Sequence, residues 1–200
     1  MGKKEVVDAM RILYEKGLVS SRDGNISFKP KNENFFYITP SQVKKNNLTE
    51  DQLIKVTFDN VDCTFSWDTK GVLKPSREVF MHGYIHMYNI YSEVDSYVVH
   101  AHPQHIVGYC GLESHNELSN IKSIFPELNV GNIGKNVEYL SAGSKILASK
   151  CFHNLIGNNI IALEKHGSLS VGTDMDTILE EINTIEYYLK ILLYSKIMCM

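Results

Sequence analysis

The segment Ser96-Tyr97-Val98-Val99-His100-Ala101-His102-Pro103 constrains the fold more than any other part of the sequence. Its β-branched and aromatic residues are typical of a buried strand, and Pro103 disfavours a helix just before it. Side chains two positions apart on a strand lie on the same face. His100 and His102 are therefore expected to point in one direction, so that two imidazoles could converge on one ion.

Helical and strand patterns alternate along the rest of the chain. Apolar residues at steps of three and four predict helices over residues 5–18, 77–91, 105–110, 144–155 and 177–197. Apolar runs predict strands over residues 25–28, 35–38, 54–59, 96–102, 159–164 and 168–171, with one helical turn over 48–53 and a less regular region around 129–134. Because tight turns join several strands, we expect an α+β fold with a mostly antiparallel central sheet flanked by helices.

Composition excludes several classes of protein. The chain has 200 residues, 44% hydrophobic and 22% charged, which predicts one globular domain over residues 1–200. A net charge of -3 gives no electrostatic reason to bind a phosphate backbone, so nucleic acid is not an expected partner. The sequence contains no apolar run long enough for a bilayer and no signal-peptide pattern, so we expect no membrane association and a cytoplasmic location. The four cysteines are widely spaced, which predicts free thiols.

A third metal ligand is expected near the His100–His102 pair, because catalytic zinc sites commonly use three protein ligands. His166 is the candidate, in a turn between two apolar strands. The alternative is that His100 and His102 are hydrogen-bonded histidines of the sheet. His82 and His86, four residues apart on an expected helix, form a second pair for which ordinary packing is favoured over metal binding. His105, His115 and His153 have no matching partner in the sequence.

Two further segments are suited to binding an anion. Lys74-Pro75-Ser76-Arg77-Glu78 is a turn that leads into a helix, where backbone N–H groups favour negative charge. The alternative is that Ser76 caps the helix and Glu78 stabilises its first turn. Asp23-Gly24-Asn25-Ile26-Ser27 contains a Gly-Asn turn that permits close approach of a ligand, although a simple hairpin explains it equally well.

The order and spacing of these motifs resemble the class II aldolase/adducin family along nearly the whole sequence. The motifs are Gly24-Asn25-Ile26-Ser27, Ile38-Thr39-Pro40-Ser41, Lys74-Pro75-Ser76-Arg77-Glu78, Val98-Val99-His100-Ala101-His102-Pro103, Tyr139 with Gly143-Ser144, and Lys165-His166-Gly167-Ser168-Leu169. The resemblance implies the three-layer fold of that family.

The resemblance also implies a divalent metal, usually zinc, held by His100, His102 and His166. Another divalent metal could take the same position. Glu78 matches the family's catalytic acid/base, and it could ligate the metal when substrate is absent. A glutamate at this position resembles the family's aldolases more than its ribulose-phosphate epimerase, which has an aspartate.

Phosphate contacts in the family match Asn25, Ser41 and Ser76 in this sequence. The sequence departs from the family pattern at two positions. Arg77 replaces a second phosphate-binding serine and could bind a phosphate or a carboxylate through its planar charged group. Gln42 replaces a glycine, which could narrow the pocket and leaves the sugar phosphate undetermined.

The expected activity is cleavage of a ketose 1-phosphate, such as L-fuculose 1-phosphate, to dihydroxyacetone phosphate and a short aldehyde through a metal-stabilised enediolate. Alternatives on the same scaffold are a 4-epimerase, a methylthioribulose-1-phosphate dehydratase and a sugar-acid phosphate decarboxylase. A non-catalytic adducin-like binding module is a further alternative. The resemblance implies a homotetramer with sites at the subunit interfaces, to which Tyr139 could contribute. Family aldolases often have a longer C-terminal tail that covers the site.

Overall fold

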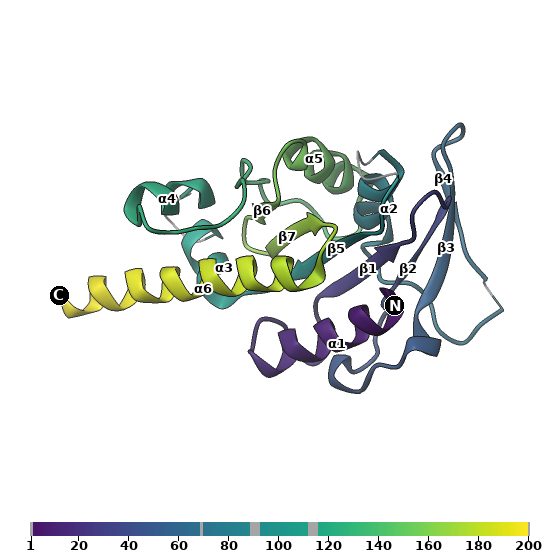
Figure 1. The fold of residues 1–200 in the computed structure, drawn as a ribbon, viewed down its shortest axis with the longest axis horizontal. Coiled ribbons are helices and arrows are strands. Elements are labelled where there is room, and N and C mark those ends of the chain that lie inside the picture. Colours follow the sequence, from purple (N-terminus) through teal and green to yellow (C-terminus); the bar gives the residue numbers. More distant parts are fainter. Residues whose placement is uncertain (1, 69, 89–92, 112–115, 200) are drawn as a thin grey trace.

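A central antiparallel sheet organises the molecule, which we describe from a computed structural model covering residues 2–68, 70–88, 93–111 and 116–199. Within these ranges seven strands form one sheet in the order β4-β3-β2-β1-β5-β7-β6 (Figure 1). The strands are β1 (Asn25–Lys29), β2 (Phe35–Ile38), β3 (Ile54–Asp59), β4 (Thr64–Ser66), β5 (Ser96–Ala101), β6 (Ile160–Leu163) and β7 (Gly167–Gly172). Every neighbouring pair is antiparallel, as the sequence predicts.

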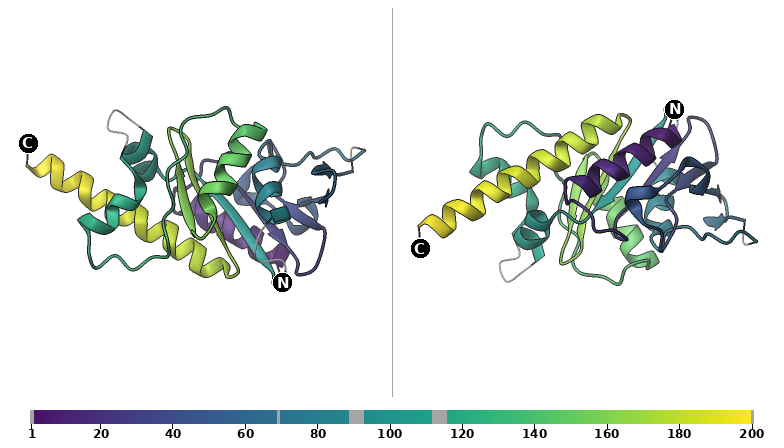
Figure 2. Two further views of the ribbon diagram at one scale, coloured as in Figure 1. Left: turned by 90° about the horizontal axis from the view of Figure 1, so that it is seen from above. Right: turned by 90° about the horizontal axis from the view of Figure 1, so that it is seen from below.

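Helices cover both faces of the sheet, so the expected three layers are present (Figures 1 and 2). The α-helices are α1 (Gly2–Glu15), α2 (Val79–Tyr88), α3 (Gln104–Gly111), α4 (Ile121–Ile124), α5 (Lys145–Leu155) and α6 (Met175–Met198). Three 3-10 turns are η1 (Lys45–Asn47), η2 (Glu50–Gln52) and η3 (Leu118–Asn120). In the described ranges, no helix has the combined length and apolar character needed to cross a bilayer.

Strand β5 is an interior strand of the sheet and has both faces buried, with β1 on one side and β7 on the other. Its side chains alternate between two hydrophobic cores. Tyr97, Val99 and Ala101 belong to the core beneath α1, α3 and α6, whereas Val98 belongs to the core beneath α2 and α5. By this alternation His100 lies on the α2/α5 face of the sheet.

The helix on each face is held by a stripe of apolar side chains. In α1 the buried Val6, Met10 and Leu13 recur at steps of three and four, which is the spacing that predicts this helix. Helix α6 packs beside α1 on the same face and extends beyond the sheet at its C-terminal end (Figure 2). On the opposite face α2 and α5 pack against each other and cover Val98 and Leu169.

Several predicted boundaries differ from those observed. Helix α2 starts at Val79 rather than at residue 77, since Ser76 and its neighbours form the turn that precedes it, and the predicted continuation over residues 89–91 lies outside the described residues, as does His115. Helix α6 starts two residues earlier than predicted because Asp174 caps it by accepting a hydrogen bond from the N–H of Thr177. Turn η3 and helix α4 were not predicted, because each is too short to show a helical period.

Candidate active site

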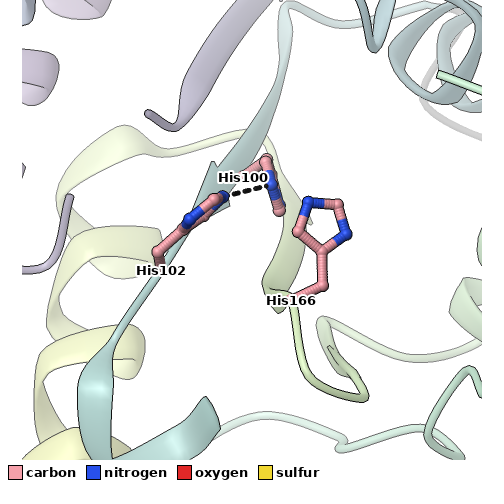
Figure 3. A group of neighbouring side chains, drawn as sticks. All are labelled: His100, His102 and His166. Atoms are coloured by element: carbon pink, nitrogen blue, oxygen red, sulfur yellow. Dashed lines mark hydrogen bonds between the residues drawn. The ribbon is translucent and has the colours of Figure 1, made fainter. Parts of the chain in front are cut away.

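Three histidines converge at one end of β5. His100 lies in the strand, His102 follows it directly, and His166 comes from the tight turn between β6 and β7 (Figure 3). One ring nitrogen from each lies within 4.8 Å of the corresponding atoms of the other two, and the Nε2 atoms of His100 and His102 are 2.9 Å apart. The structure thus brings together the three residues that the sequence analysis selects as metal ligands.

The β6–β7 turn presents His166 because its backbone has an unusual local shape. Lys165 adopts a φ of 58°, in the left-handed region, and the N–H of His166 donates to the carbonyl of Leu163 at 3.1 Å. Gly167 then passes so close to β5 that a Cβ there would lie 2.2 Å from the carbonyl oxygen of Ala101. A glycine is therefore required after His166 for the turn to approach the end of β5.

The orientation of the His100 ring is fixed by its hydrogen bond to the neighbouring strand. Its Nδ1 lies 2.9 Å from the carbonyl oxygen of Ser168, and a carbonyl can only accept. Nδ1–H therefore donates, and Nε2 faces His102 and Glu78. Metal-binding histidines commonly have this arrangement, because the hydrogen bond on the far nitrogen orients the ring.

Glu78 lies against the same cluster, one residue before α2. Its Oε2 is 3.2 Å from Nε2 of His100, and its Oε1 is 3.3 Å from Nε2 of His166. Asn25 donates to Oε2 from Nδ2 at 2.8 Å. Burial raises the pKa of Glu78, but the opposing effects of His100 and of the hydrogen bond from Asn25 outweigh it, so the pKa lies below its usual value.

The donor set fits a divalent cation. Among the described residues, the buried Oε1 of Glu78 has no hydrogen-bond partner, which is costly for a carboxylate oxygen unless a positive charge lies close by. Burial lowers the pKa of His102 to about 3 and also lowers the pKa of His166. Both rings are therefore neutral near pH 7, the form in which imidazole binds a metal. Three imidazoles beside a carboxylate match a zinc-type catalytic site.

A pocket of about 420 Å³ opens directly onto this cluster. Its walls include Glu78, His102 and His166. The three residues that the resemblance assigns to phosphate binding, Asn25, Ser41 and Ser76, also line it, together with Arg77. Asn25 and Ser76 are buried, whereas the side chain of Arg77 is exposed at the rim.

Backbone hydrogen bonds hold the two polar loops of the pocket side by side. The N–H of Ser41 donates to the carbonyl of Lys74 at 2.9 Å, and the N–H of Ser76 donates to that of Thr39 at 3.2 Å. Gln42 adopts a φ of 61°, a conformation that glycine adopts without strain. Its side chain also lines the pocket, which is consistent with the expected narrowing.

Lys45 also lines this pocket, and the sequence does not predict it. Its side chain is buried, and Nζ donates to the carbonyl of Pro40 at 3.0 Å. Burial lowers the pKa of Lys45 to about 8. The surrounding Lys44-Lys45-Asn46-Asn47 reads as an ordinary exposed polar turn, so no pattern in the sequence distinguishes Lys45 from Lys44.

The second histidine pair is placed differently from the first. His82 and His86 are fully buried on the inner face of α2, and both contact the hydroxyl group of Ser27, at 2.6 and 2.7 Å. Among the described residues, neither belongs to a group of side chains that could hold a metal ion. The structure thus places this pair in the packed interior, and the absence of metal binding there stays a prediction. Their contact with Ser27 was not predicted, because it joins positions 55 and 59 residues apart.

Comparison with known proteins agrees with this geometry. A family model described as "Class II Aldolase and Adducin N-terminal domain" matches residues 4–193. An L-fuculose phosphate aldolase of Methanococcus maripaludis is 29% identical, with 94% of this chain and 97% of that protein covered. A probable methylthioribulose-1-phosphate dehydratase of Acyrthosiphon pisum is 27% identical, with 96% and 87% covered.

Solved structures show the same fold. The crystal structure of a sugar-phosphate aldolase from Thermotoga maritima superposes with a TM-score of 0.79 at 23% identity, and the match covers 96% of this chain and 93% of that chain. The family match over residues 4–193 spans every strand of the sheet together with the histidine cluster and Glu78. The chain therefore belongs to the class II aldolase and adducin family.

Proposed function

We propose that the protein is a zinc-dependent aldolase that cleaves a ketose 1-phosphate, such as L-fuculose 1-phosphate, to dihydroxyacetone phosphate and a short aldehyde. One observation carries the proposal: the Nε2 atoms of His100 and His166 lie 3.2 and 3.3 Å from the carboxylate of Glu78, beside a pocket lined by polar groups. The family match supports the reaction class, and the relative named L-fuculose phosphate aldolase supports the substrate.

The histidines would hold the metal, and Glu78 would move the proton. When bound, a divalent cation supplies positive charge beside the substrate oxygen that becomes negative as the carbon–carbon bond breaks. In the condensation direction Glu78 accepts the proton from C3 of dihydroxyacetone phosphate, and in cleavage it returns that proton to C3. The lowered pKa of Glu78 supports the accepting role, because a carboxylate is the form that can take a proton.

Ser41, Ser76, Asn25 and Arg77 would anchor the phosphate at the other end of the pocket. Binding a group remote from the reacting bond orients the substrate and supplies energy for catalysis.

Arg77→Ala should raise KM about tenfold with little change in kcat, because a hydrogen bond to a charged group contributes about 1.5–3 kcal/mol. Arg11→Ala, on α1 and paired with Asp8, is the matched control with unchanged kinetics.

Product analysis tests the proposed reaction. The purified protein, loaded with zinc, is incubated with a panel of ketose 1-phosphates, and dihydroxyacetone phosphate is measured by its enzymatic reduction with NADH. We expect release from at least one ketose 1-phosphate and loss of release after chelation. No release from any member of the panel, from protein with full metal content, would contradict the proposal.

Dehydration of methylthioribulose 1-phosphate is the second candidate, favoured by the 27% identical relative named as a probable dehydratase of that compound. The same panel distinguishes the two reactions, since dehydration keeps the carbon chain intact and releases no dihydroxyacetone phosphate. Epimerisation at C4 and decarboxylation of a sugar-acid phosphate would each give a different product in the same assay. A non-catalytic adducin-like role is disfavoured by the intact cluster of three histidines and Glu78.

We also propose a single domain over residues 1–200, a cytoplasmic location and a homotetramer whose sites lie at subunit junctions. The C-terminal part of α6 extends beyond the sheet (Figure 1). It supports an interface, because large apolar side chains on it are exposed, namely Tyr187, Ile191, Leu193, Tyr194, Ile197 and Met198. Tyr139 is 63% exposed and is a candidate for contact with a neighbouring subunit. Light scattering would give the mass of the assembly, and a monomer would contradict it.

A further inference from the structure

A continuous chain of buried polar groups leads away from Glu78 into the interior of the molecule. Asn25 donates to Glu78 at 2.8 Å, and its Oδ1 lies 2.5 Å from Nε2 of His82. Nδ1 of His82 lies 2.6 Å from the hydroxyl of Ser27, which in turn lies 2.7 Å from Nε2 of His86. All five residues are buried, so these groups depend on one another rather than on water.

The direction of every hydrogen bond in this chain follows from the carboxylate at its end. A carboxylate can only accept, so the amide of Asn25 must turn its NH₂ toward Glu78 and its oxygen toward His82. Nε2 of His82 must then donate to Asn25, which leaves Nδ1 as an acceptor for the hydroxyl of Ser27. Because that hydroxyl has one proton, the oxygen of Ser27 accepts from Nε2 of His86. Because burial disfavours the charged form of both rings, each has a single proton, and this pattern places it on Nε2.

The surroundings of the two rings agree with this assignment. Burial lowers the pKa of His82 well below its ordinary value and lowers that of His86 to about 3, so each ring has one donor and one acceptor at neutral pH. The remaining Nδ1 of His86 lies 3.5 Å from the hydroxyl of Ser96, which can donate to it. Reversing one hydrogen bond would require reversing all the others, because each group has one donor and one acceptor in the chain.

The chain acts on the orientation of Asn25. An asparagine amide can rotate by half a turn, and only one of its two orientations presents a donor to Glu78. His82 selects that orientation through Nε2–H, and Asn25 then holds Oε2 of Glu78 beside Nε2 of His100. Without His82, the amide of Asn25 would no longer be held in one orientation. The carboxylate of Glu78 would then lose a fixed hydrogen-bond donor.

We propose that His82 is a positioning residue for Glu78: through Asn25, it fixes the carboxylate against the three histidines at the end of β5. The role of Glu78 in turnover rests on the proposed function, whereas the direction of the hydrogen bonds does not. Sequence spacing alone leaves His82 as a packing residue. Its Nε2 is connected to Glu78 through Asn25, and its Nδ1 is held by Ser27, which gives it a functional connection.

The first test measures the tautomers of the wild-type protein as isolated with its metal. Long-range ¹H–¹⁵N NMR of protein labelled with ¹⁵N-histidine separates a protonated ring nitrogen from a bare one, and His82→Gln and His86→Gln spectra assign the signals. We expect His82 and His86 each to be neutral with the proton on Nε2. A proton on Nδ1 of His82, or a ring that averages both tautomers, would overturn the proposal.

The second test separates positioning from packing. His82→Leu removes both hydrogen-bonding nitrogens and should lower kcat about 10- to 100-fold, with KM within about threefold and metal content unchanged, as for partners of site residues in general. His82→Gln supplies an N–H and a carbonyl on one side chain and should recover most of that loss. A folded leucine variant with wild-type kcat would overturn the proposal, as would equal losses in both variants.

The two tests also separate this proposal from the proposed function. If the leucine variant does not fold, the tautomer of His82 in the wild-type protein decides the question. If the wild-type protein releases no dihydroxyacetone phosphate while His82 carries its proton on Nε2, the aldolase assignment fails and the positioning of Glu78 stands. The kinetics of the variants are then measured on whichever sugar phosphate the wild-type protein converts.

Discussion

The molecule contains two histidine pairs whose surroundings differ. His100 and His102 lie at the end of β5, where His100 uses one ring nitrogen on the carbonyl of Ser168 and directs the other toward Glu78 and the pocket. His82 and His86 lie on the buried face of α2, and both ring nitrogens of each are hydrogen-bonded to neighbouring side chains. The difference favours metal binding at the first pair, because His100 has a ring nitrogen that faces other possible ligands, whereas both ring nitrogens of His82 and His86 are occupied by neighbouring side chains.

The largest expected effect comes from breaking the cluster at the end of β5. His166→Ala removes one of the three imidazoles, so we expect loss of stoichiometric zinc and a fall in kcat/KM on the order of a thousandfold. Elemental analysis and the aldolase assay measure the two quantities. The matched control is His153→Ala, an exposed histidine on α5 that should change neither. Full zinc content in the His166 variant would contradict the assignment of this residue as a ligand.

Replacing the carboxylate should separate proton transfer from metal binding. Glu78→Gln keeps the shape and an oxygen, but it cannot accept a proton. We expect full zinc content with kcat lowered about 10²- to 10³-fold, the usual contribution of a general acid/base. Unchanged activity at full zinc content would exclude the assigned role of Glu78.

The sequence predicts the sheet and the residues around the pocket well, and the interior connections poorly. Strong periodic patterns predict β5 and α1, and the fold class is confirmed. The histidine and glutamate motifs select residues that the structure places together, although their roles remain proposals. The Asn25–Ser27 segment, in contrast, reads as a hairpin, and its contacts with His82 depend on how α2 packs across the sheet. That packing is tertiary, so local patterns do not encode it.

Removing the shared hydroxyl tests the buried pair by its effect on stability. Ser27→Ala leaves an acceptor of His82 and a donor of His86 without their partner, and we expect the free energy of unfolding to fall by about 3 kcal/mol. Urea unfolding measures the change, and zinc content should stay the same. Ser170→Ala is the matched control, because its buried hydroxyl has no hydrogen-bond partner among the described residues, and its removal should not lower the free energy of unfolding. Equal effects of the two substitutions would contradict the network.

The smallest expected effect is a pH dependence specific to His86. Burial lowers its pKa to about 3 in the folded protein, whereas an unfolded histidine titrates near pH 6.5. The unfolded state therefore binds the proton first, and stability falls as the pH drops from 6.5 toward 3. This histidine should reduce the free energy of unfolding by about 2 kcal/mol at pH 5 relative to pH 7.

Urea unfolding of the wild-type protein and of His86→Gln at pH 5, 6 and 7 measures this contribution. The variant should show a shallower dependence on pH, because it lacks one group that takes up a proton on unfolding. His153→Gln, which replaces an exposed histidine, should retain the wild-type slope. Identical slopes for His86→Gln and the wild type would show that His86 is not held neutral by burial.

We expect the histidines at the end of β5, and not the pair in α2, to hold the metal. Crystals of the zinc-loaded protein, measured on both sides of the zinc absorption edge, locate the zinc through the position of the anomalous signal. One strong peak should lie about 2.0–2.1 Å from the Nε2 atoms of His100, His102 and His166. A peak beside His82 and His86, or no peak at the end of β5 in zinc-loaded crystals, would contradict it.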